Sequence, residues 1–275
     1  MLIWILYILR SGRDYDIGLK TRLHRAWRRI VFWGGDIRRI SHFPWITWDT
    51  SERLISAEEA LTIMKLIKAG DIGIHREKGF LSNLAIPGFM IHAWIHINES
   101  EDLSRLEIVE AISEGVKKRS ALYPIYSDYC IILRPKNVTK EDINQACAKA
   151  LKIVGCNYDV DFKFDIEEEI KIFGEKDIES QKEREILSTN LKAEWDGGFS
   201  CTETVSFSWW HKRKELQLFR QKARGKQVIL ADSMINPQFD IIWISKSVTP
   251  EVAAKFGLGE MGIEMIKDWC SKHSI

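Results

Sequence analysis

Cys201 is the residue whose surroundings best suit chemistry, and it lies in the stretch GGFSCTETVSFSWW that covers residues 197–210. The glycine pair permits a close approach of the chain, and Val205, Trp209 and Trp210 follow at near-helical spacing. Cys201 is therefore predicted in the first turn of a helix. There, unpaired backbone N–H groups and the positive end of the helix dipole favour the nucleophilic thiolate. A cysteine alone is more often a buried packing residue, so this interpretation depends on its partners.

Two residues earlier in the chain supply what a cysteine hydrolase needs besides the thiol. His92 lies in the β-type run FMIHAWIHI, and Glu110 lies in the next predicted strand, residues 106–112. An imidazole on a neighbouring strand can move the proton, and a carboxylate can orient the ring. The helix N–H groups beside Cys201 are suitable oxyanion donors.

Each of these two residues has a competitor of the same type on its own strand. His96 lies on the same face as His92 but about 13 Å away, so both rings cannot contact one thiolate. Glu107 lies on the opposite face from Glu110 by strand alternation, so only one of these carboxylates can serve the site. Spacing alone leaves both choices open.

The order of these motifs resembles the permuted papain-like amidases of the YiiX type, which belong to the NlpC-like papain-fold superfamily. The matching stretches, which together span about residues 66–246, are GDIGI, IPGFMIHAWIHI, IVEAISEGV, GCNYDVDFKFD, FSCTETV and NPQFDIIWIS. The histidine precedes the cysteine, which is the reverse of papain and is what circular permutation produces. The resemblance implies an α+β fold in which an antiparallel sheet packs against the helix that carries the nucleophile.

The resemblance also implies roles for individual residues. Cys201 becomes the nucleophile, His92 the general base and acid, and Glu110 the third group. Tyr158 is placed beside the nucleophile, as an oxyanion or substrate-side candidate. The chain departs from the family pattern at Thr202, where the family has a serine.

These roles predict a thiol-dependent hydrolase, an amidase or peptidase that forms an acyl-enzyme on Cys201. Cell-wall-type peptides or amide-linked small molecules are the substrates that the superfamily suggests, and no metal or organic cofactor is implied. One alternative is a lipid-directed acyl hydrolase or transferase, as in the lecithin–retinol acyltransferase branch of the same superfamily. Another is a papain-like binding module without catalysis.

The first 49 residues are predicted to form a basic, Trp-rich helical appendage ahead of a catalytic domain at residues 50–275. Leu19, Leu23 and Trp27 share one helical face, and arginines supply most of the other. This helix either packs on the main domain with a solvated basic face or lies on an anionic membrane surface.

Composition limits the classes of partner and compartment. The net charge of +1 gives no basic excess that would favour nucleic acid as a partner. The five cysteines are an odd number without metal-type spacing, which favours a reducing compartment. The apolar start MLIWILYILR lacks the features of a secretory signal and is shorter than the ~20 residues of a spanning helix. The cytoplasm or the inner face of a membrane is therefore expected.

The remaining pattern predicts the elements that position the candidate residues. Helices are expected at 56–70, where Ser56 and Glu59 suggest a capping box, at 141–154 after Thr139, and as a pair that begins at Thr249. Strands are expected at 71–76, 89–97, 106–112, 128–136 and twice around Pro237. The highly charged segment 167–192 is predicted as a solvated excursion beside the Cys201 region. Asp71 is predicted to stabilise a turn, and Cys130, Cys147, Cys156 and Cys270 are predicted to be buried packing residues.

Overall fold

The computed structural model describes residues 53–78, 86–159, 198–219, 221–223 and 226–273. The predicted appendage at residues 1–49, its boundary with the catalytic domain and the charged segment 167–192 lie outside these residues.

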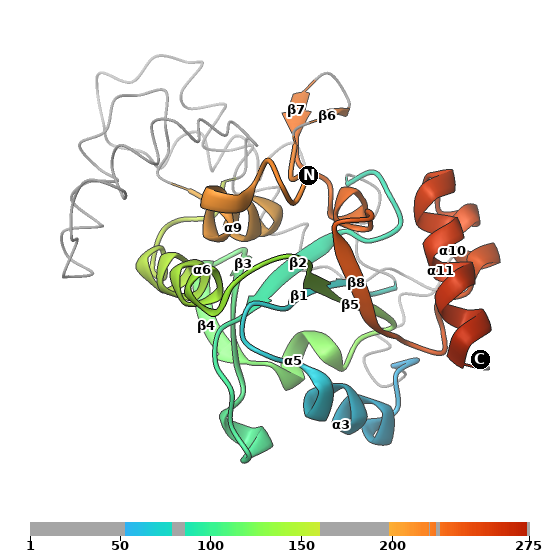
Figure 1. The fold of residues 1–275 in the computed structure, drawn as a ribbon, viewed down its shortest axis with the longest axis horizontal. Coiled ribbons are helices and arrows are strands. Elements are labelled where there is room, and N and C mark those ends of the chain that lie inside the picture. The colour runs from blue at the N-terminus through green and yellow to red at the C-terminus, as the bar shows by residue number, and fades with distance from the viewer. Residues whose placement is uncertain (1–52, 79–85, 160–197, 220, 224–225, 274–275) are drawn as a thin grey trace, which may run out of the picture. The chain divides into compact units, whose positions relative to one another are not determined.

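A six-stranded sheet in which all neighbouring strands are antiparallel forms the centre of the fold (Figure 1). In spatial order its strands are β4 (Gly115–Ser120), β3 (Glu107–Ile112), β2 (His92–His96), β1 (Ile72–Arg76), β5 (Tyr129–Pro135) and β8 (Phe239–Ile244). A separate hairpin is formed by β6 (Gln221–Ala223) and β7 (Lys226–Val228). The predicted α+β class is confirmed.

Helices cover both faces of this sheet (Figure 1). On one face lie α6 (Lys140–Lys152) and α9 (Cys201–Ser208), and on the other lie α3 (Ala57–Leu66) and the short α5 (Leu122–Ile125). The last two helices, α10 (Pro250–Lys255) and α11 (Glu260–His273), lie beside β8. Short 3₁₀ turns occupy residues 103–105, 210–212 and 231–234.

The sheet has a core on each side because successive strand residues point to opposite faces. On the α9 side, Ala93 and Ile95 of β2 pack with Val205 of the helix in the larger cluster. On the α3 side, Trp94 and Ile63 belong to a smaller cluster. Since β2 is buried on both faces, the strand that leads away from His92 is fixed from above and below.

Several local predictions are confirmed. Thr139 caps α6 in a full capping box with Asp142. Thr249 caps α10 through a hydrogen bond from the Val252 N–H. Asp71 accepts a hydrogen bond from the Lys68 N–H, as expected for a turn-forming carboxylate.

Two predictions for the first described helix are wrong in part. The helix ends at Leu66 and not at Gly70, because Ile67 is already extended; Gly70, at φ 86°, lies in the turn that leads into β1. Ser56 accepts the Glu59 N–H as expected, but the Glu59 carboxylate does not return to the cap. It accepts instead from the Lys246 N–H at 2.9 Å.

β4, α5 and the short strand β6 were not predicted from the sequence, and Cys270 is less buried than predicted. The segment that forms β4 carries Lys117, Lys118 and Arg119, which hide the alternation typical of a strand. Cys130, Cys147 and Cys156 are buried, but Cys270 is only partly buried. It lies at the edge of the apolar face of α11, whose buried residues are Gly262, Ile266 and Trp269.

Gly73 of β1 permits the packing of the largest side chain in the smaller core. It pairs in register with Trp94, and a Cβ atom at this glycine would lie 1.9 Å from the Trp94 ring. Trp94 is fully buried, so its ring has no free direction in which to move. The second glycine of the GDIGI stretch is therefore required by packing.

We expect Gly73→Ala to lower the free energy of unfolding by about 1–3 kcal/mol or more, because overpacking a rigid core forces strain. Urea unfolding followed by tryptophan fluorescence measures the change. Gly259→Ala is the matched control, since no heavy atom lies within 4 Å of the added Cβ. Equal midpoints for the two variants would contradict the packing role of Gly73.

Candidate active site

Cys201 is the first residue of α9, as the sequence predicts. Ser200 caps the helix, and its side chain accepts from the Glu203 N–H. The Glu203 carboxylate in turn accepts from the Ser200 N–H at 2.7 Å, which completes a capping box. Every residue of α9 is buried, so the start of the helix and its cysteine are fixed on all sides.

The chain just ahead of α9 is held by backbone contacts to the segment that carries Tyr158. Val116 of β4 exchanges two hydrogen bonds with Gly155 and Cys156, both at 2.9 Å. Asn157 then forms a parallel bridge with Gly198, and its carbonyl accepts from the Phe199 N–H at 2.9 Å. These contacts place Tyr158 and Cys201 in one neighbourhood although the sequence separates them widely.

The stretch that leads into His92 is held by two charged side chains, the buried Arg76 and the partly buried Asp232. Asp232 accepts from the N–H groups of Phe89 and Met90, at 2.6 and 2.7 Å. Arg76 donates to the carbonyl groups of Gly88 and Phe89, both at 3.0 Å. Gly88 has φ 108°, and a Cβ there would lie 2.6 Å from the Asp232 carboxylate. The backbone before His92 thus has a single arrangement.

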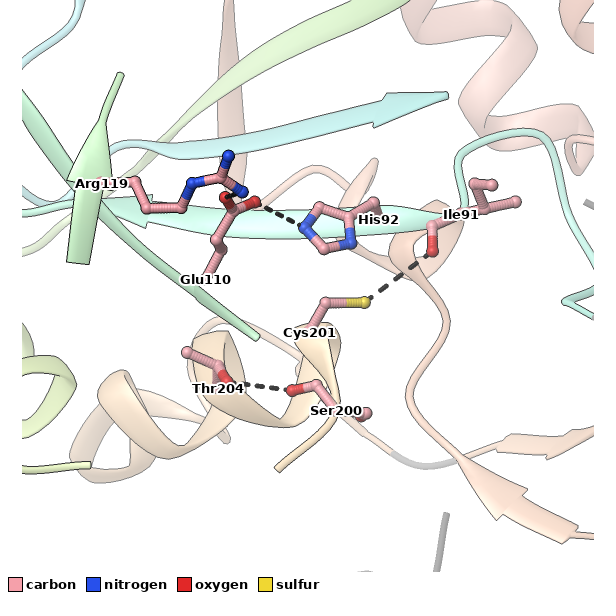
Figure 2. Close-up of polar contacts among 7 residues, drawn as sticks. All are labelled: Ile91, His92, Glu110, Arg119, Ser200, Cys201 and Thr204. Atoms are coloured by element: carbon pink, nitrogen blue, oxygen red, sulfur yellow. Dashed lines mark hydrogen bonds and ion pairs between the residues drawn. The ribbon is translucent and has the colours of Figure 1, made fainter. Parts of the chain in front are cut away.

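His92, Glu110 and Arg119 form a continuous series of polar contacts across three strands (Figure 2). His92 Nε2 lies 2.8 Å from Glu110 Oε2, and Arg119 Nη1 donates to Glu110 Oε1 at 2.9 Å. The Glu110 side chain is only 3% exposed, whereas that of His92 is 19% exposed. The imidazole therefore stands between a buried carboxylate and the surface.

Cys201 completes this series on the other edge of the His92 ring. Figure 2 shows its Sγ atom pointing toward the ring nitrogen that does not bond Glu110. The Cys201 thiol donates to the Ile91 carbonyl oxygen, with Sγ 3.8 Å from that oxygen. The structure thus brings together Cys201, His92 and Glu110, the three residues predicted as catalytic.

The protonation of this pair follows from its charges. Burial by itself lowers the pKa of His92, but the neighbouring Cys201 thiolate and the Glu110 carboxylate outweigh it and raise that pKa to about 10. Burial by itself raises the pKa of Cys201. The His92 imidazolium and the backbone N–H groups of Ala93 and Thr202 outweigh it and lower that pKa overall. Both shifts act in the direction of a thiolate–imidazolium pair.

The two competing residues lie elsewhere. His96 is fully buried at the other end of β2, where its carbonyl accepts from the Gly70 N–H at 2.8 Å. Glu107 forms an ion pair with Lys118 at 3.0 Å, and its side chain is 37% exposed. The structure places neither of them in the series that ends at Cys201.

Two residues beside the site were missed by the sequence analysis. Arg119 lies on β4, which was not predicted. The sequence feature that could have indicated it is the basic segment of residues 117–119, which closely follows the strand with Glu107 and Glu110. His75 pairs in register with His92, and their ring centroids are 4.7 Å apart. Burial, together with the positive charge of His92, lowers the pKa of His75 well below its ordinary value, so its ring is neutral.

A second group of buried polar residues surrounds the Cys201 region. Tyr158 is partly buried, and Asp159 and Glu203 are buried almost completely. Burial, followed by the charges of Cys201, Glu203 and Asp159, raises the pKa of Tyr158 well above its ordinary value, so it keeps its proton. Burial and the nearby Asp159 raise the pKa of Glu203 to about 8.

Within the described ranges, no group of three or more His, Cys, Asp or Glu residues is arranged to hold a metal ion. Each helix in the described part of the chain is too short or too polar to cross a bilayer.

Comparison of the chain with protein-family models, with curated proteins and with solved structures finds no match. The site is therefore interpreted from its own geometry.

The elevated pKa of Glu203 makes stability depend on pH. Between the ordinary glutamate pKa of about 4.3 and the folded value of about 8, the native state binds more protons than the unfolded state. The free energy of unfolding therefore falls as pH rises through this window. Glu203→Gln should remove that slope, which is at most about 1.4 kcal/mol per pH unit. Urea unfolding between pH 5 and 8 measures it, with the exposed Glu251→Gln as control, and superimposable curves for Glu203→Gln and wild type would contradict the elevated pKa.

The pH dependence of alkylation tests the Cys201–His92 pair without any substrate. Cys201 should react with iodoacetamide at pH values well below the ordinary thiol pKa of about 8.5. His92→Ala removes the largest effect that favours ionisation of this buried thiol and leaves only the weaker effects of backbone N–H groups, so the rate at pH 7 should fall about tenfold or more. Mass spectrometry follows each cysteine separately, and His96→Gln is the control on the same strand. If Cys201 reacts no faster than Cys270 and His92→Ala changes nothing, the pair does not exist.

Proposed function

We propose that this protein is a thiol-dependent hydrolase, an amidase or peptidase, that acts through an acyl-enzyme on Cys201. The single observation that carries the proposal is the placement of Cys201, at a helix N-terminus, with its Sγ atom pointing toward the His92 ring, whose Nε2 atom lies 2.8 Å from Glu110 Oε2. A nucleophile, a base within hydrogen-bond reach and a group that orients the base are the parts that nucleophilic catalysis requires.

In the first half of the reaction, the Cys201 thiolate attacks the carbonyl carbon of the substrate and a C–S bond forms. The His92 imidazolium then gives its proton to the leaving amine or alkoxide as the C–N or C–O bond breaks. Because Glu110 bonds Nε2, the nitrogen that faces Cys201 is the one that transfers the proton.

In the second half, neutral His92 takes a proton from water, and the resulting hydroxide attacks the thioester. The C–S bond breaks, the carboxylic acid leaves, and the thiolate–imidazolium pair is restored. The Glu110 carboxylate stabilises the imidazolium each time it forms.

The oxyanion that forms in each half needs hydrogen-bond donors. Backbone N–H groups in the first turn of α9 are not used within the helix and are suited to this task. Tyr158 is the candidate side chain, since its raised pKa keeps the hydroxyl protonated and able to donate.

The finer fold assignment, a circularly permuted papain-like domain, belongs to the same proposal. It is supported by the antiparallel sheet, by the packing of α9 on β2 and β3, and by the chain order His92, Glu110, Cys201. By analogy, a small peptide or another amide-linked molecule is the substrate class. The basic, Trp-rich sequence of residues 1–49 favours a second candidate, acyl transfer or hydrolysis on a lipid surface.

Trapping the acyl-enzyme tests the activity. Incubation with p-nitrophenyl esters, peptide thioesters or phospholipid vesicles should leave an acyl group on Cys201 that mass spectrometry locates, and the donor that reacts distinguishes the two candidates. Cys201→Ala should lose the burst of product and reduce turnover about a thousandfold or more. Cys270→Ser, a partly buried cysteine on α11, is the control and should keep both. A reactive Cys201 thiolate that accepts no acyl group from any donor would identify a binding module instead.

A further inference from the structure

Arg119 contacts the one carboxylate of the proposed triad and lies on the edge strand β4. Its Nη1 atom donates to Glu110 Oε1, while Oε2 of the same carboxylate is bound by His92. Both oxygens of a side chain that is only 3% exposed are therefore bound by cationic groups. The exposed fraction of the Arg119 side chain, 27%, leaves its outer part in water.

The Arg119 guanidinium also lies over the aromatic ring of Tyr123. Its carbon atom lies 4.0 Å from the centroid of the Tyr123 ring. Tyr123 is 68% exposed, the highest value among the large apolar side chains that are exposed in the described ranges. A tyrosine so exposed contributes little to the core, whereas stacking on an arginine orients the planar fork.

The charges in this series alternate. Arg119 is positive, Glu110 negative, the His92 imidazolium positive and the Cys201 thiolate negative. During the proposed reaction the His92 charge disappears when the leaving group takes its proton, but the Arg119 charge does not. Without Arg119, Glu110 would then be a buried anion beside a neutral ring, a state in which a carboxyl group tends to take up a proton.

We propose that Arg119, oriented by Tyr123, is a positioning residue that keeps Glu110 ionised and directed at His92 throughout the reaction. This inference rests on the proposed function. It adds a residue that supports the proton transfer by His92 without taking part in it. Arg119 acts through Glu110 and touches neither the thiol nor the imidazole in Figure 2.

The charged groups around Glu110 support this assignment. Burial raises the pKa of Glu110, and the charges and hydrogen bonds of His92 and Arg119 outweigh it and lower that pKa overall. Lys117 pairs in register with Glu110 but turns to Glu114, at 3.8 Å. On the helix packed across β2 and β3, Glu203 is directed to the Ser200 N–H. Among the described residues, Arg119 is thus the cation that keeps its positive charge beside Glu110 whether or not His92 carries a proton.

The neighbouring Lys118 provides a matched control on the same strand. It forms an ion pair with Glu107 of β3, as Arg119 does with Glu110, but the side chains of both members of this pair are well exposed, at 45% for Lys118 and 37% for Glu107. Lys118→Met therefore removes an equal charge from the same element without touching the series that leads to Cys201. Leu122→Ala is the corresponding control for Tyr123→Ala, because Leu122 is the neighbouring residue on α5 and its side chain is also exposed.

The test measures Cys201 alkylation by iodoacetamide from pH 4 to 9 in the full chain. An opposite charge lowers a carboxyl pKa by about 1–3 units, so Arg119→Met should move the acid midpoint of the rate upward by about one pH unit or more. At a pH on the acid limb, one unit is a tenfold loss of rate. Arg119→Lys should give a smaller shift and Tyr123→Ala a partial one, while Lys118→Met and Leu122→Ala keep the wild-type midpoint.

The outcomes separate this inference from the proposed function. If wild-type Cys201 has an ordinary thiol profile, the proposed function fails and the inference fails with it. If the wild-type profile is shifted to acid pH but Arg119→Met superimposes on wild type, or Lys118→Met shifts equally, the inference alone is overturned. Circular dichroism checks folding of each variant. Should Arg119→Met fail to fold, Arg119→Lys and Tyr123→Ala decide, because a wild-type midpoint in both would overturn the inference.

Discussion

The hydrogen bond between His92 and Glu110 places strict demands on the structure around it. A carboxylate that is almost fully removed from water is tolerated only when both oxygens are bound and its charge is compensated. The register of β2 with β3 brings His92 to one oxygen, and the register of β3 with β4 brings Arg119 to the other. The position of the carboxylate thus follows from strand pairing, and the orientation of the imidazole follows from the carboxylate.

Cys201 and His92 each stand at the first residue of an element, where the backbone is least constrained by regular hydrogen bonding. In each case a carboxylate supplies the missing constraint. Glu203 binds the backbone of the residue before Cys201, and Asp232 binds the backbone just before His92. Side chains that titrate are therefore used to hold main-chain groups, which leaves Cys201 and His92 themselves available for chemistry.

The sequence predicts the parts of this arrangement that depend on local pattern. The helix start at Cys201, the strand of His92 and the caps at Thr139 and Thr249 follow from periodicity and capping chemistry. The identity of the neighbouring strand does not follow from local pattern. Alternation indicates which face of a strand is apolar but not which strand lies beside it. For this reason the pairing of His75 with His92 was not foreseen, whereas β4, with Arg119, was not foreseen because its charged residues hide the alternation of a strand.

The bridge between Asn157 and Gly198 has a consequence for how the chain between them can change. Asn157 and Gly198 are paired directly, and the Asn157 carbonyl also accepts from the Phe199 N–H. Tyr158 and Cys201 are thus held in register by the residues next to them and not by the length of sequence between them. Because the entropy cost of joining two points of a chain grows only slowly with the number of residues between them, a change in that number is expected to cost little free energy.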